Sequence, residues 1–410
     1  MILTNPNAVG MFNKTIGIIT PWFGRFAGGA ESLARGMARE LNKRGLKTIV
    51  FTTCSLSPYD SWWENGHRPG LDYVDGIETL RFATGKDRGP YDSVIKKISH
   101  GKTLSERDEL DFFEYGINSS DLVEALRDSV NDEYELLALP YFHGLTHSVI
   151  NAYPNCISLV PCFHNEPQFY WKATGKLLSN AKYIFFNSAE EKQLTIEHFG
   201  RQIGRRIVES VVAGIGVEFP ENLDQLDEGL PKLPDSYFIY AGRKERGKNV
   251  HLLCEWFLDY LKKFDRTARL VFIGGGDESL VPRSEYLVDL GFVSEAQKLR
   301  LMRNSKAIIN LSENESFSIV IMEGWWCGVP AVVSANCAVT ANHVRRAHGG
   351  YFVSNREEFA EALKRLEDQE TARFRLGANG HEYLTREFSF DAVLSRYLEV
   401  FSNGERAKIQ

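Results

Sequence analysis

Two segments of this chain open with the same pattern, a short apolar run followed by a glycine-containing loop and a helix. In the first segment the apolar run covers residues 15–20, and apolar side chains then recur at helical spacing over residues 30–44. Gly45 ends this helix, and residues 47–53 form the next apolar run. A strand, a helix and a strand in this order predict an α/β fold with a doubly wound parallel sheet.

The same alternation restarts in the second half of the chain, at residues 237–241. Further strands of this half are expected at residues 270–273, 286–290, 307–311, 331–334 and 350–353. In the first half, a strand pair is expected near residues 72–82, followed by an inserted helical excursion. Three more strands of this half are expected at residues 135–142, 156–163 and 183–187. Between the halves, residues 214–234 are polar and rich in glycine and proline, which indicates a linker. We therefore predict two Rossmann-like domains that face each other across a ligand-binding cleft.

The composition argues against several classes of protein. A net charge of −6 over 410 residues disfavours nucleic-acid binding as the main activity. No run of 18 apolar residues is present, so a membrane-spanning helix is not expected. The polar N-terminus lacks the basic start and the apolar run of a signal peptide. The six cysteines show neither metal-binding nor disulfide spacing, and reduced thiols favour a cytoplasmic location.

Glu315 and Glu323 are the most informative side chains, because both lie close to the expected start of a helix. The strand at residues 307–311 ends just before Glu315, and the helix that follows closes at Gly328. A loop carboxylate at Glu315 suits sugar hydroxyls, and Glu323, about two turns into the helix, suits a ribose. The free N–H groups that open this helix favour a phosphate. They would belong to Ser316, Phe317, Ser318 and Ile319. Together these features predict a site for a nucleotide-sugar.

These residues resemble the glutamate-x7-glutamate signature of retaining glycosyltransferases with the GT-B fold, in the group called family 4. The match consists of Glu315-Ser316-Phe317, Glu323 and Cys327-Gly328-Val329-Pro330. In two departures from the family, Ser318 replaces the usual glycine and Trp325-Trp326 replace small residues, and we expect the tryptophans to fill core. The other segments that match the family in order are Gly28-Gly29-Ala30-Glu31, Phe163-His164-Asn165-Glu166, Gly242-Arg243 with Lys248, residues 273–277 and residues 290–293.

The resemblance implies a fold, a division of labour between domains, and a reaction. Residues 1–215 would form an acceptor-binding domain, and residues 216–390 a nucleotide-sugar-binding domain. The last helix, at residues 391–410, would cross back to the first domain. The implied reaction is transfer of a hexose with retention, by attack on the front face and without an enzyme nucleophile. UDP-glucose is the favoured donor and GDP-mannose the alternative. The acceptor would be a polysaccharide or a lipid-linked glycan.

A departing nucleoside diphosphate needs its growing negative charge neutralised. Many glycosyltransferases use a metal ion held by an Asp-x-Asp sequence, and this chain contains no such sequence. We therefore expect neither a metal ion nor a cofactor. The charge is assigned to Arg243 and Lys248, in the loop after the first strand of the second half, with Arg246 as a local rival of Lys248. A solvated basic loop is the alternative interpretation of these residues.

The remaining candidate residues take their roles from the resemblance. His164 follows an apolar strand at the place of the family's active-site histidine, and is expected to bind the donor sugar. A structural histidine is the alternative, and His143 is a second candidate for the cleft. Gly28 and Gly29 would let the backbone approach the diphosphate or the donor sugar closely. Val293 matches the position whose backbone pairs with the edge of the base.

Two further patterns each keep two interpretations. Arg35, Arg39 and Lys43 recur every four residues on the first helix, as a solvated face or as a peripheral contact with the inner face of an anionic membrane. Trp62 and Trp63 form an acceptor-stacking platform or a packing pair. Because a fold alone does not fix function, two alternatives stay open for the whole chain. These are a sugar-nucleotide epimerase of the same fold and a non-catalytic glycan-binding homologue.

Overall fold

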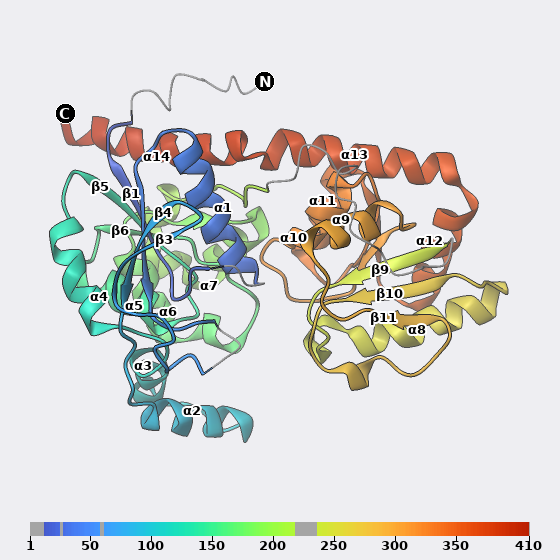
Figure 1. The fold of residues 1–410 in the computed structure, drawn as a ribbon, viewed down its shortest axis with the longest axis horizontal. Helices are drawn as coiled ribbons and strands as arrows, with labels where there is room; N and C mark the ends of the chain where they lie inside the picture. The colour runs from blue at the N-terminus through green and yellow to red at the C-terminus, as the bar shows by residue number, and fades with distance from the viewer. Residues whose placement is uncertain (1–11, 25–27, 58–60, 218–235, 410) are drawn as a thin grey trace. The chain divides into compact units, whose positions relative to one another are not determined.

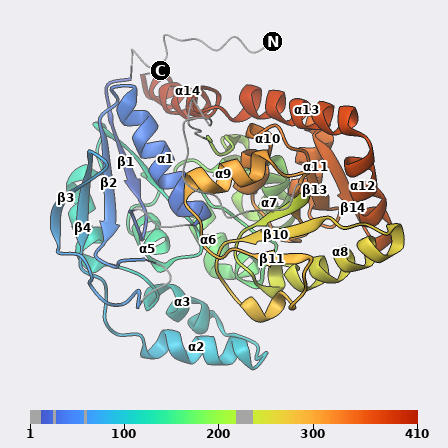
Figure 2. The same cartoon turned by 45° about the vertical axis from the view of Figure 1, so that its right-hand side comes forward.

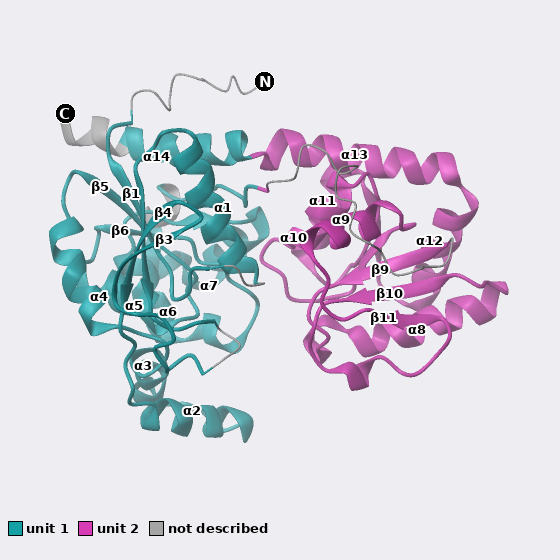
Figure 3. Ribbon diagram, in the orientation of Figure 1, with its two compact units in different colours: residues 1–216, 390–410 teal, residues 217–389 magenta. Residues whose placement is uncertain are grey.

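The computed structural model divides the chain into two compact units, drawn in different colours in Figure 3. Unit 1 comprises Met1–Gly216 and Phe390–Gln410, and unit 2 comprises Val217–Ser389. The residues that the structure describes are 12–24, 28–57, 61–217 and 236–409. Most of the predicted linker at residues 214–234 and most of the polar N-terminus lie outside the described residues.

Unit 1 is built on a six-stranded sheet with the strand order β3-β4-β2-β1-β5-β6 (Figure 1). Its strands are β1 (Thr15–Ile19), β2 (Thr48–Thr53), β3 (Gly70–Val74), β4 (Ile77–Phe82), β5 (Tyr134–Ala138) and β6 (Ile157–Leu159). Neighbours pair in parallel except at the edge, where β3 runs antiparallel to β4. β1 and β2 are buried along their whole length, as central strands of a doubly wound sheet are. A separate parallel pair joins β7 (Phe185–Phe186) to β8 (Val211–Val212).

The helices of unit 1 are α1 (Gly29–Lys43), α2 (Gly89–Ser99), α3 (Glu106–Glu114), α4 (Ser120–Ala125), α5 (Gly144–Ala152), α6 (Lys172–Asn180), α7 (Ala189–Val208) and α14 (Phe390–Ile409). Short turns of 3-10 helix occur at η2 (Leu126–Ser129) and η3 (Pro167–Tyr170). α1 lies where the sequence predicts a helix, because Leu33, Met37 and Leu41 recur on one face and are buried there.

The segment predicted as an inserted helical excursion forms the helix pair α2 and α3, at one end of unit 1 (Figures 1 and 2). A proline in its first turn opens α2. A capping box, in which Ser105 and Asp108 exchange hydrogen bonds, opens α3. Phe112 and Phe113 of α3 then pack against Trp171, with ring centroids 5.1 and 5.7 Å apart, which anchors the pair to the body of unit 1.

The last helix, α14, belongs to unit 1 although it follows unit 2 in the sequence. It lies close to α1 in both views (Figures 1 and 2). Nη2 of Arg44 lies 2.5 Å from Oδ1 of Asp391, at the start of α14. The ring of Tyr397 stacks on Phe185, with centroids 4.2 Å apart. The chain therefore returns to its first unit, as the fold implied by the resemblance requires.

Unit 2 is built on a six-stranded, all-parallel sheet with the strand order β11-β10-β9-β12-β13-β14. Its strands are β9 (Tyr237–Ala241), β10 (Arg269–Ile273), β11 (Leu287–Asp289), β12 (Ile308–Asn310), β13 (Ala331–Ser334) and β14 (Gly350–Val353). Its helices are α8 (Val250–Phe264), α9 (Glu295–Arg303), α10 (Ile319–Trp326), α11 (Ala338–Ala347), α12 (Arg356–Asp368) and α13 (Glu370–Phe388). This strand order is that of doubly wound nucleotide-binding folds. In such folds, successive strands are added on one side of the first strand and then on its other side, so the direction of winding reverses beside the first strand.

β5 and β6 of unit 1 end earlier than predicted, and β7 (Phe185–Phe186) covers only part of the strand predicted at residues 183–187. β5 ends at Ala138 and β6 ends at Leu159, in both cases four residues early. A proline follows each strand two residues later, Pro140 after β5 and Pro161 after β6. Proline has no N–H to continue the ladder of hydrogen bonds, so the chain leaves the sheet at these points. The residues beyond them lie on loops instead of on strands.

The two tryptophans that end α10 differ in burial. Trp325 is fully buried, and its indole N–H donates to the carbonyl oxygen of Gly349 at 2.8 Å. Gly349 and Gly380 leave the space for this ring, because a Cβ on either residue would overlap the indole. Trp326 is half-buried and stacks on His381, with ring centroids 5.2 Å apart. The expectation that the pair fills core is confirmed for Trp325.

Candidate active site

In unit 2 the winding reverses between β9 and β12, and ligands of doubly wound folds bind outside the carboxyl ends of such strands. The loop after β9 carries Arg243 and Lys248, and the loop after β12 carries Glu315. Asn249 ties the two loops together, because its side-chain amide donates to the carbonyl oxygen of Leu311 at 3.0 Å. The topology of unit 2 therefore brings these three predicted residues to one edge of its sheet.

Glu315 forms an ion pair with Lys248. Nζ of Lys248 lies 2.9 Å from Oε1 of Glu315, and Nδ2 of Asn310 donates to the same oxygen at 3.1 Å. The Glu315 side chain is only 13% exposed, so the pair is poorly screened by solvent. Within the described part of the chain, Oε2 of Glu315 accepts no hydrogen bond. The carboxylate thus keeps one oxygen available for a ligand hydroxyl, and the pair uses one of the three N–H donors of Lys248.

Arg243 is more accessible than Lys248. Its side chain is 60% exposed, and Nη2 lies 3.7 Å from Oε1 of Glu245, which is a loose surface pair. The backbone carbonyl of Arg243 accepts a hydrogen bond from the hydroxyl of Tyr240 at 2.6 Å, which fixes the base of the loop. Arg243 can therefore meet an anionic ligand without first breaking a strong ion pair.

Lys244, next to Arg243 in the sequence, is buried instead. Its side chain is 1% exposed, and Nζ contacts both oxygens of Asp289 at 2.8 and 2.6 Å. The N–H of Lys244 donates to the carbonyl oxygen of Gly275, and Oδ1 of Asp289 accepts from the N–H of Gly291. This pair joins the loops that follow β9, β10 and β11. This pair could not be predicted from the sequence, because a lysine in a basic loop gives no sign of burial.

Glycines allow the loops after β9 and β10 to touch. Gly274 and Gly276 adopt φ angles of 111° and 119°, which favour glycine. A Cβ on Gly274 would overlap the carbonyl oxygen of Gly242, and a Cβ on Gly276 would overlap the backbone of Lys244. The glycine run at residues 274–276, within the family-matching segment 273–277, is therefore a place of close backbone packing.

Val293, the predicted partner of the base edge, is half-buried and directly follows an exposed aromatic ring. Phe292 is 78% exposed, and its ring lies over Gly275, where a Cβ would come within 2.5 Å of it. A large exposed ring next to a glycine-rich loop is suited to stack on a planar ligand. The sequence motif gave no indication of this exposure.

The helix α10 begins later than predicted. It starts at Ile319, so that Ser316, Phe317 and Ser318 precede it instead of forming its first turn. The ring of Phe317 is 1% exposed and packs edge-on against Phe388, with centroids 4.8 Å apart. This burial draws the backbone before Ile319 toward the core, and the chain can turn into a helix only afterwards. The prediction that the N–H groups from Ser316 onward open the helix is therefore wrong for Ser316 and Phe317, which precede the N-cap residue Ser318, whereas Ile319 opens the helix as predicted.

Ser318 sits immediately before α10 in the left-handed region, with φ at 72°. This conformation costs a residue with a Cβ about 1–2 kcal/mol. The Ser318 hydroxyl is buried and accepts a hydrogen bond from Nδ2 of Asn310 at 3.0 Å. The serine that replaces the family's glycine therefore keeps a glycine-like backbone, and its side chain is satisfied inside the protein.

Glu323, the predicted ribose ligand, is the fifth residue of α10 and so lies about one turn from the helix start instead of two. Its Oε1 lies 2.8 Å from Nζ of Lys298 on α9, and Lys298 also contacts Glu295 at 2.8 Å. Burial raises the pKa of Glu323 above its ordinary value, and Lys298 opposes that shift. The sequence analysis did not single out Lys298, because a contact between two helices leaves no spacing pattern.

In unit 1 the winding reverses between β1 and β5, and the loops that follow these strands meet through aromatic rings. Trp22 and His143 pack edge to face, with centroids 4.8 Å apart. The indole N–H of Trp22 donates to the hydroxyl of Ser55 at 2.8 Å. Burial lowers the pKa of His143 to about 4, so this ring is neutral at pH 7.

Gly28 and Gly29 lie at the start of α1, as predicted. Gly28 is the N-cap residue, and the carboxylate of Glu31 occupies the space that a Cβ on Gly28 would need. A carboxylate folded back in this way is stabilised by the positive end of the helix. Around Gly29 the described residues leave open space, since a Cβ there would meet none of their atoms within 4 Å. Of the two glycines, Gly29 therefore offers its backbone to an approaching ligand.

His164 lies on the loop between β6 and η3. Its Nδ1 is 3.7 Å from Oε1 of Glu166, and the hydroxyl of Tyr141 donates to the same oxygen at 2.6 Å. Burial alone would raise the pKa of Glu166, but the contacts with His164 and Tyr141 outweigh it and hold the pKa below its ordinary value. The backbone N–H of Phe163, next to His164, donates a hydrogen bond to the carboxylate of Glu191, which fixes the start of this loop.

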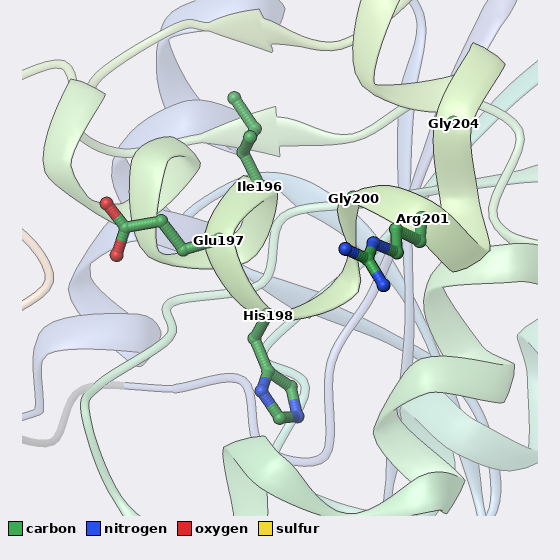
Figure 4. A pocket seen from close by; sticks show the side chains of 6 residues that line it. All are labelled: Ile196, Glu197, His198, Gly200, Arg201 and Gly204. Carbon is green, nitrogen blue, oxygen red and sulfur yellow. The ribbon is translucent and has the colours of Figure 1, made fainter.

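A cavity of about 560 Å³ opens on α7 (Figure 4). The described residues that line it are Ile196, Glu197, His198, Gly200, Arg201 and Gly204. Gly204 has non-helical angles, with φ at 18° and ψ at −92°, so a kink in the helix shapes the cavity. None of the predicted site residues is in its described lining, and we assign it no role in the predicted site.

The basic stripe on α1 is engaged in contacts within unit 1. Nη1 of Arg35 donates to the carbonyl oxygen of Gly24 at 3.3 Å. Nζ of Lys43 pairs with Glu40 at 2.8 Å, and Arg39 is half-buried. The stripe is therefore partly engaged within unit 1, and its contact with a membrane stays a prediction.

Trp62 and Trp63 pack against the start of α2. Trp62 meets Tyr91 edge to face, with ring centroids 5.3 Å apart. The guanidinium of Arg88 lies 3.4 Å from the ring centre of Trp63, and Asp92 holds Arg88 at 2.6 Å. One face of Trp63 is therefore covered, which favours the packing interpretation.

Within residues 12–24, 28–57, 61–217 and 236–409, no group of three or more His, Cys, Asp and Glu side chains is arranged to hold a metal ion. In the same part of the chain, no helix combines the length and the apolar character needed to cross a bilayer. The six cysteines are free thiols, and burial raises the pKa of Cys327 to about 12.

Comparison with known proteins finds relatives that match nearly the whole chain. The family model described as glycosyl transferases group 1 matches residues 224–383. A D-inositol 3-phosphate glycosyltransferase from Thermomonospora curvata is 33% identical over 92% of this chain and 91% of its own. A protein of the same name from Corynebacterium aurimucosum is 25% identical over 93% of both chains.

Solved structures share the fold over the same span. The trehalose-6-phosphate synthase OtsA is similar with a TM-score of 0.70 and 13% identity, covering 95% of this chain and 98% of that one. TarM of S. aureus is similar with a TM-score of 0.65 and 11% identity, covering 95% and 99%. These neighbours establish the GT-B fold, with two Rossmann-like domains, and at such identities they establish the fold alone.

Proposed function

This chain belongs to the glycosyl transferases of group 1, and from that premise we propose that it transfers a hexose from a nucleoside diphosphate sugar, with retention of configuration and without a metal ion. The observation that carries the proposal is the pair of Lys248 and Glu315 where the winding of unit 2 reverses. The lysine can neutralise a phosphate, and the free carboxylate oxygen can accept a sugar hydroxyl. A diphosphate sugar is the ligand whose chemistry matches both groups.

The sugar, ribose and base of the donor each have a proposed partner in unit 2. Oε2 of Glu315 accepts hydrogen bonds from hydroxyls of the donor sugar. Glu323 accepts a hydrogen bond from the ribose. The backbone of Val293 pairs with the edge of the base, next to the exposed ring of Phe292. Each of these partners lies on a loop at the carboxyl end of a strand or in the helix that follows it, where doubly wound folds bind nucleotides.

The departing diphosphate gains negative charge as its bond to the sugar breaks. In our proposal Arg243 and Lys248 neutralise that charge, and the N–H of Ile319 at the start of α10 adds a donor. These fixed groups take the part that a divalent ion takes in other glycosyltransferases. Removing one fixed donor of this kind from a transition state typically costs about 2.7–4 kcal/mol.

We assign His164 of unit 1 to the donor sugar. Its Nδ1 faces Glu166 at 3.7 Å, which leaves Nε2 to hydrogen-bond a sugar hydroxyl. In the front-face reaction that the family resemblance implies, the acceptor oxygen forms its bond to the sugar on the side from which the diphosphate leaves. The departing phosphate oxygen takes the acceptor's proton, so that no side chain becomes covalently bound to the sugar.

UDP-glucose is the proposed donor, with GDP-mannose as the alternative. In support, one fold neighbour from E. coli is bound with UDP-2-fluoro glucose, and a TarM complex contains UDP. For the acceptor we propose a polysaccharide or a lipid-linked glycan. The likeness to the D-inositol 3-phosphate glycosyltransferase of T. curvata makes an inositol phosphate the alternative acceptor.

The decisive experiment follows release of free UDP from UDP-glucose in the presence of EDTA, with candidate acceptors added one at a time. The proposal expects acceptor-dependent release that persists in EDTA and is lost in Glu315→Gln. NMR of the product then reports whether the anomeric configuration is retained. Conversion of UDP-glucose into another sugar nucleotide without release of UDP would establish an epimerase instead. A melting temperature unchanged by UDP, GDP and ADP would favour a non-catalytic homologue.

A further inference from the structure

The two signature glutamates of unit 2 share a local arrangement. Each carboxylate has one oxygen held by a lysine, Glu315 by Lys248 at 2.9 Å and Glu323 by Lys298 at 2.8 Å. In each case the held oxygen is Oε1, and among the described residues Oε2 accepts no hydrogen bond. The lysine therefore fixes the direction in which the second oxygen can accept a hydrogen bond from a ligand.

Lys298 is itself well fixed. It lies in α9, whose start is set by a capping box between Ser294 and Gln297. Its side chain is 18% exposed, against 79% for its second partner Glu295. On the other side of the contact, the Glu323 side chain is 14% exposed. The ion pair between Lys298 and Glu323 is therefore largely shielded from solvent, whereas the pair between Lys298 and Glu295 is exposed to solvent.

Burial of two side chains and a hydrogen bond hold α9 in place beside α10. Leu299 and Met302 of α9 are buried. The thiol of Cys327, which follows α10, approaches the carbonyl oxygen of Leu299 at 3.3 Å. With both helices anchored, the backbones of Lys298 and Glu323 are held within reach of the 2.8 Å contact between their side chains. The position of the Glu323 carboxylate thus depends on a residue outside the signature.

We propose that Lys298 is a positioning residue that orients Glu323 for the ribose of the donor. The inference rests on the proposed function, because it concerns the ribose subsite of the same donor. Lys298 compensates the charge of the sheltered carboxylate and occupies Oε1, so that Oε2 is presented to a ribose hydroxyl. Without the lysine, Glu323 is free to turn to other rotamers or to take up a proton, and it no longer favours a nucleotide with ribose hydroxyls.

The test measures discrimination between ribose and dideoxyribose, which a merely structural change would not alter. Calorimetric titration of the full chain with UDP and with 2′,3′-dideoxy-UDP gives a ratio of dissociation constants for each variant. GDP and ADP, each with its dideoxy form, are titrated alongside. In the wild type we expect the dideoxy form to bind about 10-fold more weakly, the size of one hydrogen bond to a charged group.

Lys298→Met is expected to reduce this ratio to within about 2-fold of unity, and Lys298→Arg to restore most of it. Glu295→Gln is the matched control, since it removes the exposed partner of the same lysine, and it should keep the wild-type ratio. If Lys298→Met does not fold, Lys298→Gln tests the same loss of charge. Circular dichroism and the melting temperature verify that each variant is folded.

The outcomes separate this inference from the function on which it rests. A Lys298→Met protein that keeps the wild-type ratio overturns the inference and leaves the function standing. A wild type that binds nucleotides without regard to the ribose hydroxyls also overturns it. A wild type that binds no nucleotide removes the proposed function, and the inference with it.

Discussion

The two units contain the same topological feature but differ in its chemistry. In both sheets the winding reverses beside the first strand, between β1 and β5 in unit 1 and between β9 and β12 in unit 2. In unit 2 the loops at this point are joined by an ion pair, Lys248 with Glu315 at 2.9 Å. In unit 1 they are joined by uncharged rings, Trp22 with His143 at 4.8 Å.

Under the proposed function, this difference suits the two units to different ligands. In that proposal, Arg243 and Lys248 of unit 2 compensate the negative charge of a nucleoside diphosphate. Unit 1 offers a neutral histidine and aromatic surface, which suit the less charged part of a reaction partner. The variants below test this difference between the units, in order of decreasing expected effect.

Arg243→Ala removes an accessible fixed charge from unit 2. We expect kcat/KM for UDP release to fall by about 2.7–4 kcal/mol of transition-state free energy, which corresponds to roughly 100- to 1000-fold. Arg375→Ala, at an exposed position on α13 of the same unit, is the control and should change the value by less than about 0.5 kcal/mol. Near wild-type activity in Arg243→Ala would remove the assignment of charge to this residue.

His143→Asn tests the neutral character of unit 1. The folded pKa of His143 is about 4, below its ordinary value of 6.5, so the unfolded chain binds a proton over this interval and the folded chain does not. The contribution of His143 to stability is therefore present above pH 6.5 and is lost as pH falls toward 4. We expect the wild type to lose up to about 3 kcal/mol of unfolding free energy over this range through His143.

Urea unfolding at several pH values measures this dependence. His143→Asn should flatten the pH profile between 6.5 and 4. His198→Asn, which changes an exposed histidine on α7, is the control and should leave the profile as in the wild type. Identical profiles for wild type and His143→Asn would show that this ring is not kept neutral by burial.

Tyr141→Phe removes the hydroxyl that donates to Glu166 beside His164. We expect a loss of about 1.5–3 kcal/mol of unfolding free energy at pH 7, as for a hydrogen bond to a charged group. The pKa of Glu166 is held below 4.5, so the contribution is present above pH 4.5 and is lost as pH falls through the lowered folded pKa. Denaturant titration at pH 7 and pH 3 measures the change.

Tyr170→Phe is the control for that variant, because its hydroxyl bonds Asn165 at an exposed position. It should cost less, and its cost should not depend on pH. A cost for Tyr141→Phe that is equal at the two pH values would show that the hydroxyl is not bound to an ionised Glu166.

The smallest expected change in unfolding free energy is at Ser318. Variants at this position test how unit 2 accommodates a serine in place of the family's glycine. Ser318→Ala keeps the strained φ and loses the hydrogen bond from Asn310, so we expect a cost of about 0.5–1.5 kcal/mol. Ser318→Gly loses the same bond but relieves a strain of about 1–2 kcal/mol, so its net change should be near zero. Thermal unfolding compares the two variants, and a less stable glycine variant would contradict the strain.

Features that depend on neighbouring residues could be predicted from the sequence. The strand predicted at residues 237–241 is observed as β9 (Tyr237–Ala241), because an unbroken apolar run before Gly242 suffices for a buried parallel strand. The helix α1 was found from the spacing of its apolar residues, and the doubly wound sheets from the order of strands and helices. The loops that carry Arg243, Lys248 and Glu315 follow from that order.

Features that depend on contacts between distant residues could not be predicted. The start of α10 was placed too early, because the sequence does not show that burial of Phe317 holds the preceding backbone away from a helix. Lys298 meets Glu323 across two helices, and buried Lys244 meets Asp289 across two loops. No spacing of residue types marks such pairs. The roles of the site residues stay predictions until the experiments above are done.

The indole of Trp325 has a consequence for any exchange of parts between this protein and its relatives. The absence of side chains at Gly349 and Gly380 leaves the space that the indole fills, so the residues at these three positions depend on one another. A chimera that imports a smaller residue at position 325 would carry an internal void, and one that imports a side chain at position 380 would be obstructed. We therefore expect α10, α13 and the residue before β14 to be transplantable together and to fail when transplanted one at a time.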